Sequence, residues 1–291
     1  MITVSVPGKV ILMGDHAVVH GKPGLIAAIN KRLTVEVSEG KSAHMEYIVH
    51  ILGVIKHHFR LSKMPQMRIR IHSDIPEGYH LGSSAAVAVG VVGAVSYFLK
   101  KMWNPTLINQ LAYEADKYIH KTPSGVDNTT ITFGGFLWYR KELEFLRSFW
   151  QLPLKLPSAL NHFSLIDTGR PKENTGEMVA FVKSQKNLQT FLDANETQTK
   201  RVAIAIKEGD EKMLLDAIRK GERTLESIGV VGKKVIPVIR AIEKSGGAAK
   251  ILGGGGRAAG VGYLLCYTRK PLKGSLPIKL GEEGIRLERK A

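Results

Sequence analysis

The clearest chemical signal in the sequence is a stretch in which glycines and serines precede a long apolar segment. It reads IPEGYHLGSSAAVAVGVVGAV and spans residues 75–95. Backbone N–H groups at the start of a helix are unpaired and lie at the positive end of the helix dipole, so they can bind an anion. Ser83 and Ser84 add hydroxyls that can cap the helix or bind Mg²⁺. No lysine follows the glycines, so this is not a Walker A loop, and taken alone the stretch fits a plain loop with a serine cap equally well.

A second stretch, EADKYIHKTPSGVDNTT at residues 114–130, supplies two carboxylates. Asp116 lies at the edge of an apolar helical stripe, where a charge needs a partner such as a metal ion. Asp127 follows a turn fixed by Pro123 and Gly125. Beside a phosphate site, one carboxylate can bind Mg²⁺ while the other orients or deprotonates a hydroxyl. Singly, Asp116 fits a surface charge and Asp127 a helix cap.

A third stretch, SVPGKVILMGDHAVVHGKPGLIAAI at residues 5–29, places a lysine in an apolar strand. Lys9 is either an edge lysine with its ammonium in solvent or a cation held over phosphate or an acidic partner. Asp15 and His16 lie in the turn that follows. Neither His16 nor His20 has a companion at zinc-binding spacing.

These residues must be positioned by an α+β chain with strands and helices mixed in both halves. Alternating apolar residues predict strands in the first half at residues 2–6, 10–13, 34–37, 67–76 and 134–139, with helices at 45–61, 84–101 and 105–120. A charged, proline-containing passage at 140–162 predicts the boundary between two domains, residues 1–155 and 156–291. The second half is predicted to hold strands at 163–166 and 260–268 and helices at about 173–191, 195–208, 210–227 and 233–245.

Composition favours an intracellular protein that binds anions. The chain has 291 residues, a net charge of +16 and a single cysteine, Cys266, so an internal disulfide is excluded. No secretory signal or membrane-spanning run is evident, and we expect a cytoplasmic protein. The basic residues are scattered, and the charge alone also suits nucleic acid or an acidic membrane.

Together the motifs resemble the mevalonate kinases, a family of the GHMP superfamily of small-molecule kinases, and in particular its short, archaeal-like type. PEGYHLGSSAA resembles the family's P-x-G-x-G-L-G-S-S-A-A, and PGKVILMGDHAVV its P-G-K-V-I-L-x-G-E-H-A-V-V. HKTPSGVDN resembles H-G-x-P-S-G-V-D-N, and DTGRPKENTGEMVAFV is similar to the segment that opens the C-terminal half. The resemblance implies an N-terminal half like ribosomal protein S5 domain 2, a ferredoxin-like C-terminal half and an active site in the cleft between them.

The resemblance also implies a reaction, ATP-dependent phosphorylation of the C5 hydroxyl of (R)-mevalonate in isoprenoid precursor biosynthesis, and a role for each matching residue. Asp127 and Lys9 would be catalytic, and His16, Asp15 and Thr168 would bind the substrate. ATP would be bound by Pro76, Gly78, His80, Leu81, Gly82, Ser83, Ser84, Ala85 and Ala86, and by Gly253 and Gly254. Ser84 and Asp116 would bind Mg²⁺.

Several residues depart from the family pattern. Asp116 and Asp15 stand where glutamate is usual, and His80 and Lys121 stand where glycine is usual. The third motif, KILGGGGRAAGVGYLL, has Leu252 and Arg257 and lacks the alanine of the family's T-G-A-G-G-G-G. These departures leave the nucleotide contacts of the third motif open.

Three other functions compete with this interpretation. One is a different GHMP kinase, such as phosphomevalonate kinase, another is a nucleic-acid-binding protein, and the third is a non-catalytic nucleotide-binding protein. The expected partners are mevalonate and ATP, with no nucleic acid and no membrane. Apolar side chains on the second-half helices fit either a homodimer face or the core.

Overall fold

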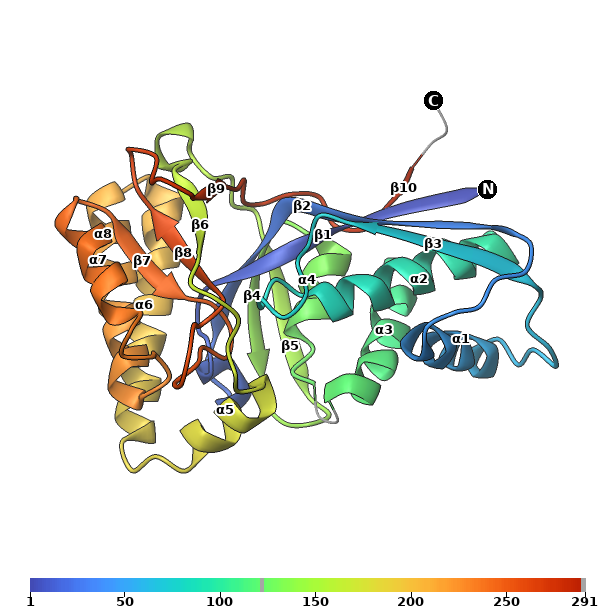
Figure 1. Ribbon diagram of the computed structural model, residues 1–291, viewed down its shortest axis with the longest axis horizontal. Coiled ribbons are helices and arrows are strands. Elements are labelled where there is room, and N and C mark those ends of the chain that lie inside the picture. The colour runs from blue at the N-terminus through green and yellow to red at the C-terminus, as the bar shows by residue number, and fades with distance from the viewer. Residues whose placement is uncertain (121–122, 289–291) are drawn as a thin grey trace.

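The computed structural model describes residues 1–120 and 123–288 and contains two antiparallel sheets (Figure 1). The larger sheet has the order β10-β1-β2-β4-β5, with β3 also paired to β2. Its strands are β1 (Ile2–Met13), β2 (Gly24–Glu39), β3 (Met67–Ser73), β4 (Phe136–Lys141), β5 (Arg147–Leu152) and β10 (Arg286–Glu288). The smaller sheet has the order β7-β8-β6-β9, from β6 (Phe163–Asp167), β7 (Ala248–Ile251), β8 (Tyr263–Tyr267) and β9 (Leu276–Pro277).

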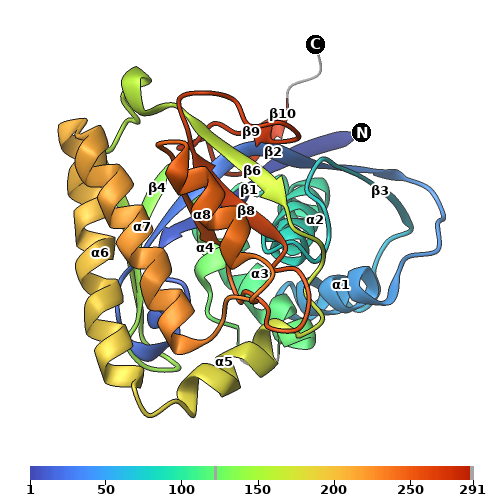
Figure 2. The same ribbon diagram turned by 60° about the vertical axis from the view of Figure 1, so that its left-hand side comes forward.

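Helices cover each sheet. Helices α2 (Ser83–Lys100) and α4 (Val126–Phe133) pack against the larger sheet, and α1 (Glu46–His58) and α3 (Pro105–His120) pack against α2 (Figure 1). Helices α7 (Glu211–Ile228) and α8 (Ile236–Lys244) pack against β7 of the smaller sheet, α6 (Leu188–Glu208) lies beside α7, and α5 (Thr175–Lys183) lies at the bottom of the view in Figure 2. Helices α6 and α7 pack against each other, and α6 also contacts β1 and β2, so the two halves are joined by side-chain packing.

Helix α2 is the central element of the N-terminal core. Within the described residues it is the one helix that is long and apolar enough to cross a membrane, but 61% of that window is buried, as in the core helix of a folded domain. Gly90 and Gly93 let it approach its neighbours, because an added Cβ would lie 2.7 Å from Val35 Cγ2 and 2.5 Å from Ile285 Cδ1, respectively. Close packing of this helix fixes the position of its first turn.

The end of the chain returns to the first sheet. Strand β10 pairs antiparallel with β1, and the register aligns Val4 with Leu287. The last strand of the chain therefore belongs to the sheet of the first half. The predicted domain boundary between residues 155 and 156 stays a prediction.

The predicted helix boundary near residues 192–194 is wrong. Helix α5 starts at a capping box between Asn174 and Glu177 and ends before Ser184, and α6 runs unbroken from Leu188. Buried residues continue through the predicted break, since Asn195 is fully buried and donates to Thr224 Oγ1 at 2.9 Å. The predicted boundary passage also contains a strand, β5.

Candidate active site

Lys9 and Asp127 form the centre of the candidate site. Strand β1 carries Lys9. Asp127 lies in the first turn of α4, and the helix begins directly after Gly125, whose φ is +82°. Lys9 Nζ lies 2.9 Å from Asp127 Oδ1. The lysine side chain is 4% exposed and the aspartate side chain 35% exposed, so a buried cation holds a carboxylate that solvent or a substrate can still reach.

The start of α2 lies directly beside this pair. Gly82 precedes the helix with φ +80° and has no side chain to cap it, so the N–H groups of the first turn meet no capping side chain. The backbone N–H of Lys9 donates to Leu81 O at 3.0 Å, which ties β1 to the loop. A Cβ at Gly82 would lie 3.2 Å from Lys9 Cγ, so the lysine stem passes over the glycine. The Lys9 ammonium and the uncapped N–H groups of the first turn of α2 thus lie close together, an arrangement that suits a phosphate.

Asp116, Ser84 and His120 form a polar group on the neighbouring helices. Ser84 Oγ lies 3.4 Å from His120 Nε2, and Asp116 Oδ1 lies 3.9 Å from the same nitrogen. Asp116 is 4% exposed, and its Oδ1 has no hydrogen-bond partner among the described residues. Burial raises the pKa of Asp116 to about 6, against the opposing effect of His120.

A buried carboxylate oxygen without a partner, next to a hydroxyl, fits a divalent cation. Within residues 1–120 and 123–288 there is no group of three or more His, Cys, Asp or Glu side chains that could hold a metal. Asp116 and Ser84 would therefore need oxygens from a bound phosphate or from water to complete the coordination of Mg²⁺.

Comparison with known proteins identifies the family. The mevalonate kinase of Archaeoglobus fulgidus is 32% identical over 303 residues, which cover 98% of this chain and 99% of that protein. The chain belongs to the mevalonate kinase family. Residues 46–135 match the model of the GHMP kinases N terminal domain, which includes the loop before α2, Asp116 and Asp127.

Solved structures agree on the GHMP kinase fold. The mevalonate kinase of Methanococcus jannaschii has a TM-score of 0.78 and 21% identity, over 98% of this chain and 96% of that one. The phosphomevalonate kinase of Streptococcus pneumoniae, in complex with phosphomevalonate and AMPPNP, has a TM-score of 0.76 and 18% identity over 93% of each chain. The fold alone therefore does not choose between these two substrates.

Asp15, which was predicted to bind the substrate, contacts the C-terminal half. Its side chain is fully buried, its Oδ1 accepts from Gly253 N at 2.7 Å, and its Oδ2 lies 2.6 Å from Lys250 Nζ. A substrate-binding role for Asp15 stays a prediction. Asp15 holds the glycine loop, residues 253–262, beside the N-terminal half.

His16 and Thr168 also contact the glycine loop. His16 Nε2 lies 3.1 Å from Gly254 O, and burial lowers the pKa of this ring. Its Nδ1 has no partner among the described residues, so a substrate-binding role for His16 stays a prediction. Thr168 Oγ1 donates to Gly262 O at 2.7 Å and accepts from Val261 N at 3.0 Å, so its hydroxyl contacts the backbone of the loop, and its substrate contact stays a prediction.

The residues of the loop before α2 and of its first turns that were predicted to bind ATP fall into two groups. Gly78, His80, Gly82, Ser83 and Ser84 follow the loop and the first turn of α2. Leu81, Ala85 and Ala86 are buried in the core, and the N–H of Ala86 already donates to Gly82 O at 2.9 Å. The buried side chains of Leu81, Ala85 and Ala86 can support the loop from the core. Only backbone groups of these residues that have no partner remain for a ligand.

Three charged residues near the site were missed by sequence reasoning. Lys250 is the buried partner of Asp15, and Glu222 accepts from Ile251 N at 3.0 Å. Arg170 lies over the loop before α2, since a Cβ at Gly78 would lie 2.5 Å from Arg170 Nε. Lys250 opens the third motif, three positions before Gly253, and Arg170 lies in the segment that resembles the start of the C-terminal half, while nothing in the sequence singled out Glu222.

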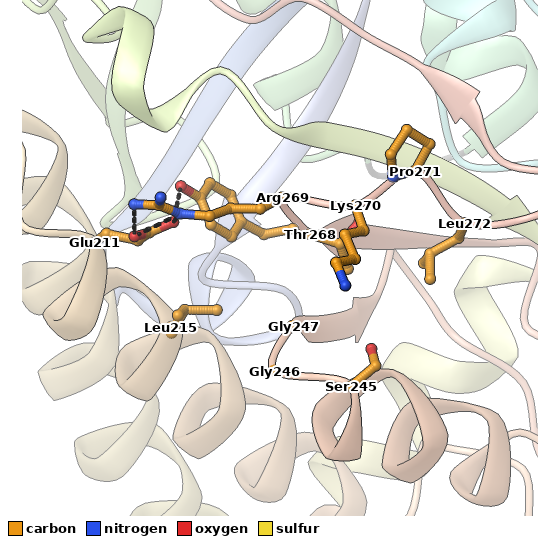
Figure 3. A pocket seen from close by; sticks show the side chains of 11 residues that line it. Glu211, Leu215, Ser245, Gly246, Gly247, Thr268, Arg269, Lys270, Pro271 and Leu272 are labelled. Atoms are coloured by element: carbon orange, nitrogen blue, oxygen red, sulfur yellow. Dashed lines mark hydrogen bonds and ion pairs between the residues drawn. The ribbon is translucent and has the colours of Figure 1, made fainter.

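A pocket of about 400 Å³ lies elsewhere, between the start of α7 and the end of α8 (Figure 3). Two of its charged side chains pair with each other, because Arg269 Nε donates to Glu211 Oε1 at 2.8 Å, as the dashed lines show. None of the catalytic residues predicted for a mevalonate kinase lines it.

Proposed function

We propose that this protein transfers the γ-phosphoryl group of ATP to the C5 hydroxyl of (R)-mevalonate and so forms 5-phosphomevalonate. One observation carries the proposal most directly, the Lys9–Asp127 pair at 2.9 Å beside the uncapped start of α2. It places a carboxylate, a cation and open amides at one point, which is what phosphoryl transfer to an alcohol requires.

Each residue of the site has a distinct task in this reaction. The first-turn amides of α2 and Lys9 bind the phosphate oxygens and stabilise their negative charge. Asp127 orients the C5 hydroxyl and accepts its proton as the hydroxyl oxygen bonds to the γ-phosphorus. The bond from that phosphorus to the bridging oxygen breaks, and ADP leaves with the electron pair. Positioning and charge neutralisation supply most of the rate.

Mg²⁺ belongs to the proposal through the chemistry of its candidate ligands. Ser84 and Asp116 would hold the ion, and the unpartnered Oδ1 of Asp116 is the observation that favours it. A bound Mg²⁺ would neutralise charge on the phosphates of ATP.

A substrate panel tests the function. ADP release is measured with mevalonate, phosphomevalonate, homoserine and galactose, and we expect the highest kcat/KM with mevalonate. A higher value with phosphomevalonate would assign the protein to the rival reaction. No turnover with any alcohol, together with nucleotide binding, would identify a non-catalytic nucleotide-binding protein.

The Asp127→Asn variant tests the assigned base. We expect kcat to fall by about 10²-fold or more, the usual scale for a positioned acid–base group, with an unchanged unfolding midpoint. Asp216→Asn is the matched control, since that aspartate pairs with Lys220 of α7 and Arg201 of α6 rather than with a residue assigned to the site, and it should leave kcat unchanged. Equal activity in the two variants would reject the role of Asp127.

A further inference from the structure

His80 occupies an unusual backbone conformation in the loop before α2. Its φ is +63°, in the left-handed region that glycine adopts freely and that costs other residues about 1–2 kcal/mol. The loop thus holds a large side chain at a position where a glycine would fit without strain. Contacts made by the ring must offset that cost.

The ring of His80 fills a hollow formed by three glycines of the glycine loop. A Cβ at Gly253 would lie 2.8 Å from both Cβ and Cγ of His80. A Cβ at Gly254 would lie 3.5 Å from Cε1, and one at Gly262 would lie 3.4 Å from Cδ2. The glycines therefore make room for the imidazole, and any side chain at position 253 would collide with it.

The residue before His80 adds a second contact between the same two loops. Tyr79 packs against Tyr263, with ring centroids 4.8 Å apart. The Cβ position of Gly262 lies 3.6 Å from Tyr79 Cα. The loop before α2 and the glycine loop are therefore interlocked through two consecutive side chains.

The electrostatic surroundings argue against His80 as a cation for phosphate. Burial, together with the nearby charge of Lys9, lowers the pKa of His80 to about 4, so the ring is neutral at physiological pH. Its Nε2 is buried and has no hydrogen-bond partner among the described residues. A neutral ring packed among glycines contributes by shape and contact.

We propose that His80 is a positioning residue whose ring fastens the glycine loop onto the loop before α2, so that both loops are ordered before the nucleotide binds. The proposal rests on the proposed function in one respect, because it assumes that these loops receive the phosphates of ATP. Order established before binding lowers the entropic cost of binding, so the ring should act on nucleotide affinity.

Three substitutions of His80 distinguish the contribution of the ring from that of the left-handed backbone conformation. His80→Gly and His80→Asn both tolerate the left-handed conformation but remove the ring. We expect each to raise the Kd of a non-hydrolysable ATP analogue and the KM for ATP by about 10-fold, with kcat within about 3-fold of wild type. His80→Phe keeps a ring of similar shape, and we expect its Kd to stay within about 3-fold of wild type.

The split between KM and kcat distinguishes positioning from a general structural role. Loss of folded protein would lower apparent kcat in proportion and leave KM unchanged, and that result would overturn the proposal. So would an unchanged Kd in His80→Asn, or a loss in His80→Phe equal to that in His80→Asn.

A double variant tests whether His80 acts through the glycine loop. Gly253→Ala should also raise the Kd, because its methyl collides with the ring. In His80→Gly/Gly253→Ala that collision is gone, so the two losses should combine to less than their product. Losses that multiply would show independent effects and contradict the interlock.

Direct nucleotide binding keeps this proposal separate from the proposed function. If wild type binds the ATP analogue but phosphorylates no mevalonate, the proposed reaction fails while the Kd comparison still decides the role of His80. If wild type turns over mevalonate and the variants bind the analogue equally well, the role of His80 fails alone.

Discussion

Removing one charge of the buried ion pair between Asp15 and Lys250 should lower the free energy of unfolding more than removing one charge of an exposed pair. Both side chains have zero exposure, and their charged atoms lie 2.6 Å apart. In Asp15→Asn the lysine remains buried without its counter-ion, while the new amide oxygen can still accept from Gly253 N. Removing one partner of a buried pair typically costs about 3–5 kcal/mol.

A second carboxyl group limits that loss. Burial raises the pKa of Glu222 to about 8, so this group is mostly protonated at neutral pH, and Lys250 is near enough to oppose the rise. When Asp15 is neutralised, Glu222 can ionise and become the counter-ion, at a cost of about 1.4 kcal/mol for each pH unit below its pKa. We therefore expect the lower end of the range, about 3 kcal/mol, or a melting temperature lower by about 6 °C for a chain of this size.

Chemical and thermal denaturation at pH 7 measure the loss, with two comparison variants. Asp15→Asn/Lys250→Met removes both charges and should recover most of the stability, because an apolar replacement of a buried pair is often neutral. Asp216→Asn breaks two solvent-accessible pairs, with Lys220 and Arg201, and should cost about 1 kcal/mol. A loss in Asp15→Asn no larger than in Asp216→Asn, or a double variant as unstable as the single one, would refute the reasoning.

Two further predictions concern the other buried carboxyl groups. The raised pKa of Glu222 means that its contribution to stability is complete below about pH 4.5 and is lost as pH rises through about 8; Glu222→Gln should flatten this fall between about pH 4.5 and 8 in denaturation curves, and an unchanged slope would count against the assignment. Asp116→Asn removes a buried carboxylate whose Oδ1 has no hydrogen-bond partner among the described residues and lies 3.9 Å from His120 Nε2, so the metal-free variant should melt at the same or a higher temperature than wild type and lose most of the Mg²⁺-induced rise seen with ATP present. Glu114→Gln on the exposed face of the same helix should keep that rise, and an intact rise in Asp116→Asn would remove this residue from the Mg²⁺ site.

Much of the site could be predicted because short sequence patterns around its residues indicate their role. A glycine-rich loop before an apolar helix predicts open amides wherever the helix packs, and the start of α2 confirms that prediction. A lysine in an apolar strand and an aspartate after a rigid turn predict a paired charge, and Lys9 and Asp127 form that pair. Residue type, helix geometry and the family resemblance were sufficient here.

The partners that are distant in sequence could not be predicted in the same way. The resemblance implied that Asp15 binds the substrate, and nothing near it in the sequence indicated its pairing with a lysine 235 positions later in a strand of the other half. The break between α5 and α6 was also hidden, because helical spacing of apolar residues continues on both sides of Gln185–Asn187 and only the cap geometry shows where each helix ends.

The buried partners also explain how the third motif can depart from the family pattern. Its position does not depend on its own few side chains, since Asp15 binds Gly253 N, His16 contacts Gly254 O and Glu173 accepts from the N–H of Ala258 at 3.0 Å. Arg257 packs its guanidinium over the ring of Phe181, 4.0 Å from the ring centroid.

A loop held at several points by side chains from other segments can change residues that make none of these contacts, such as Arg257, without moving. The shorter Asp15 is compatible with this arrangement, because it reaches both Gly253 N and Lys250 Nζ. The acidic residues around the site thus differ in what their side chains contact. Asp127, which pairs with Lys9, and Asp116, whose Oδ1 has no hydrogen-bond partner among the described residues, are the ones proposed for phosphoryl transfer, whereas Asp15 binds the glycine loop.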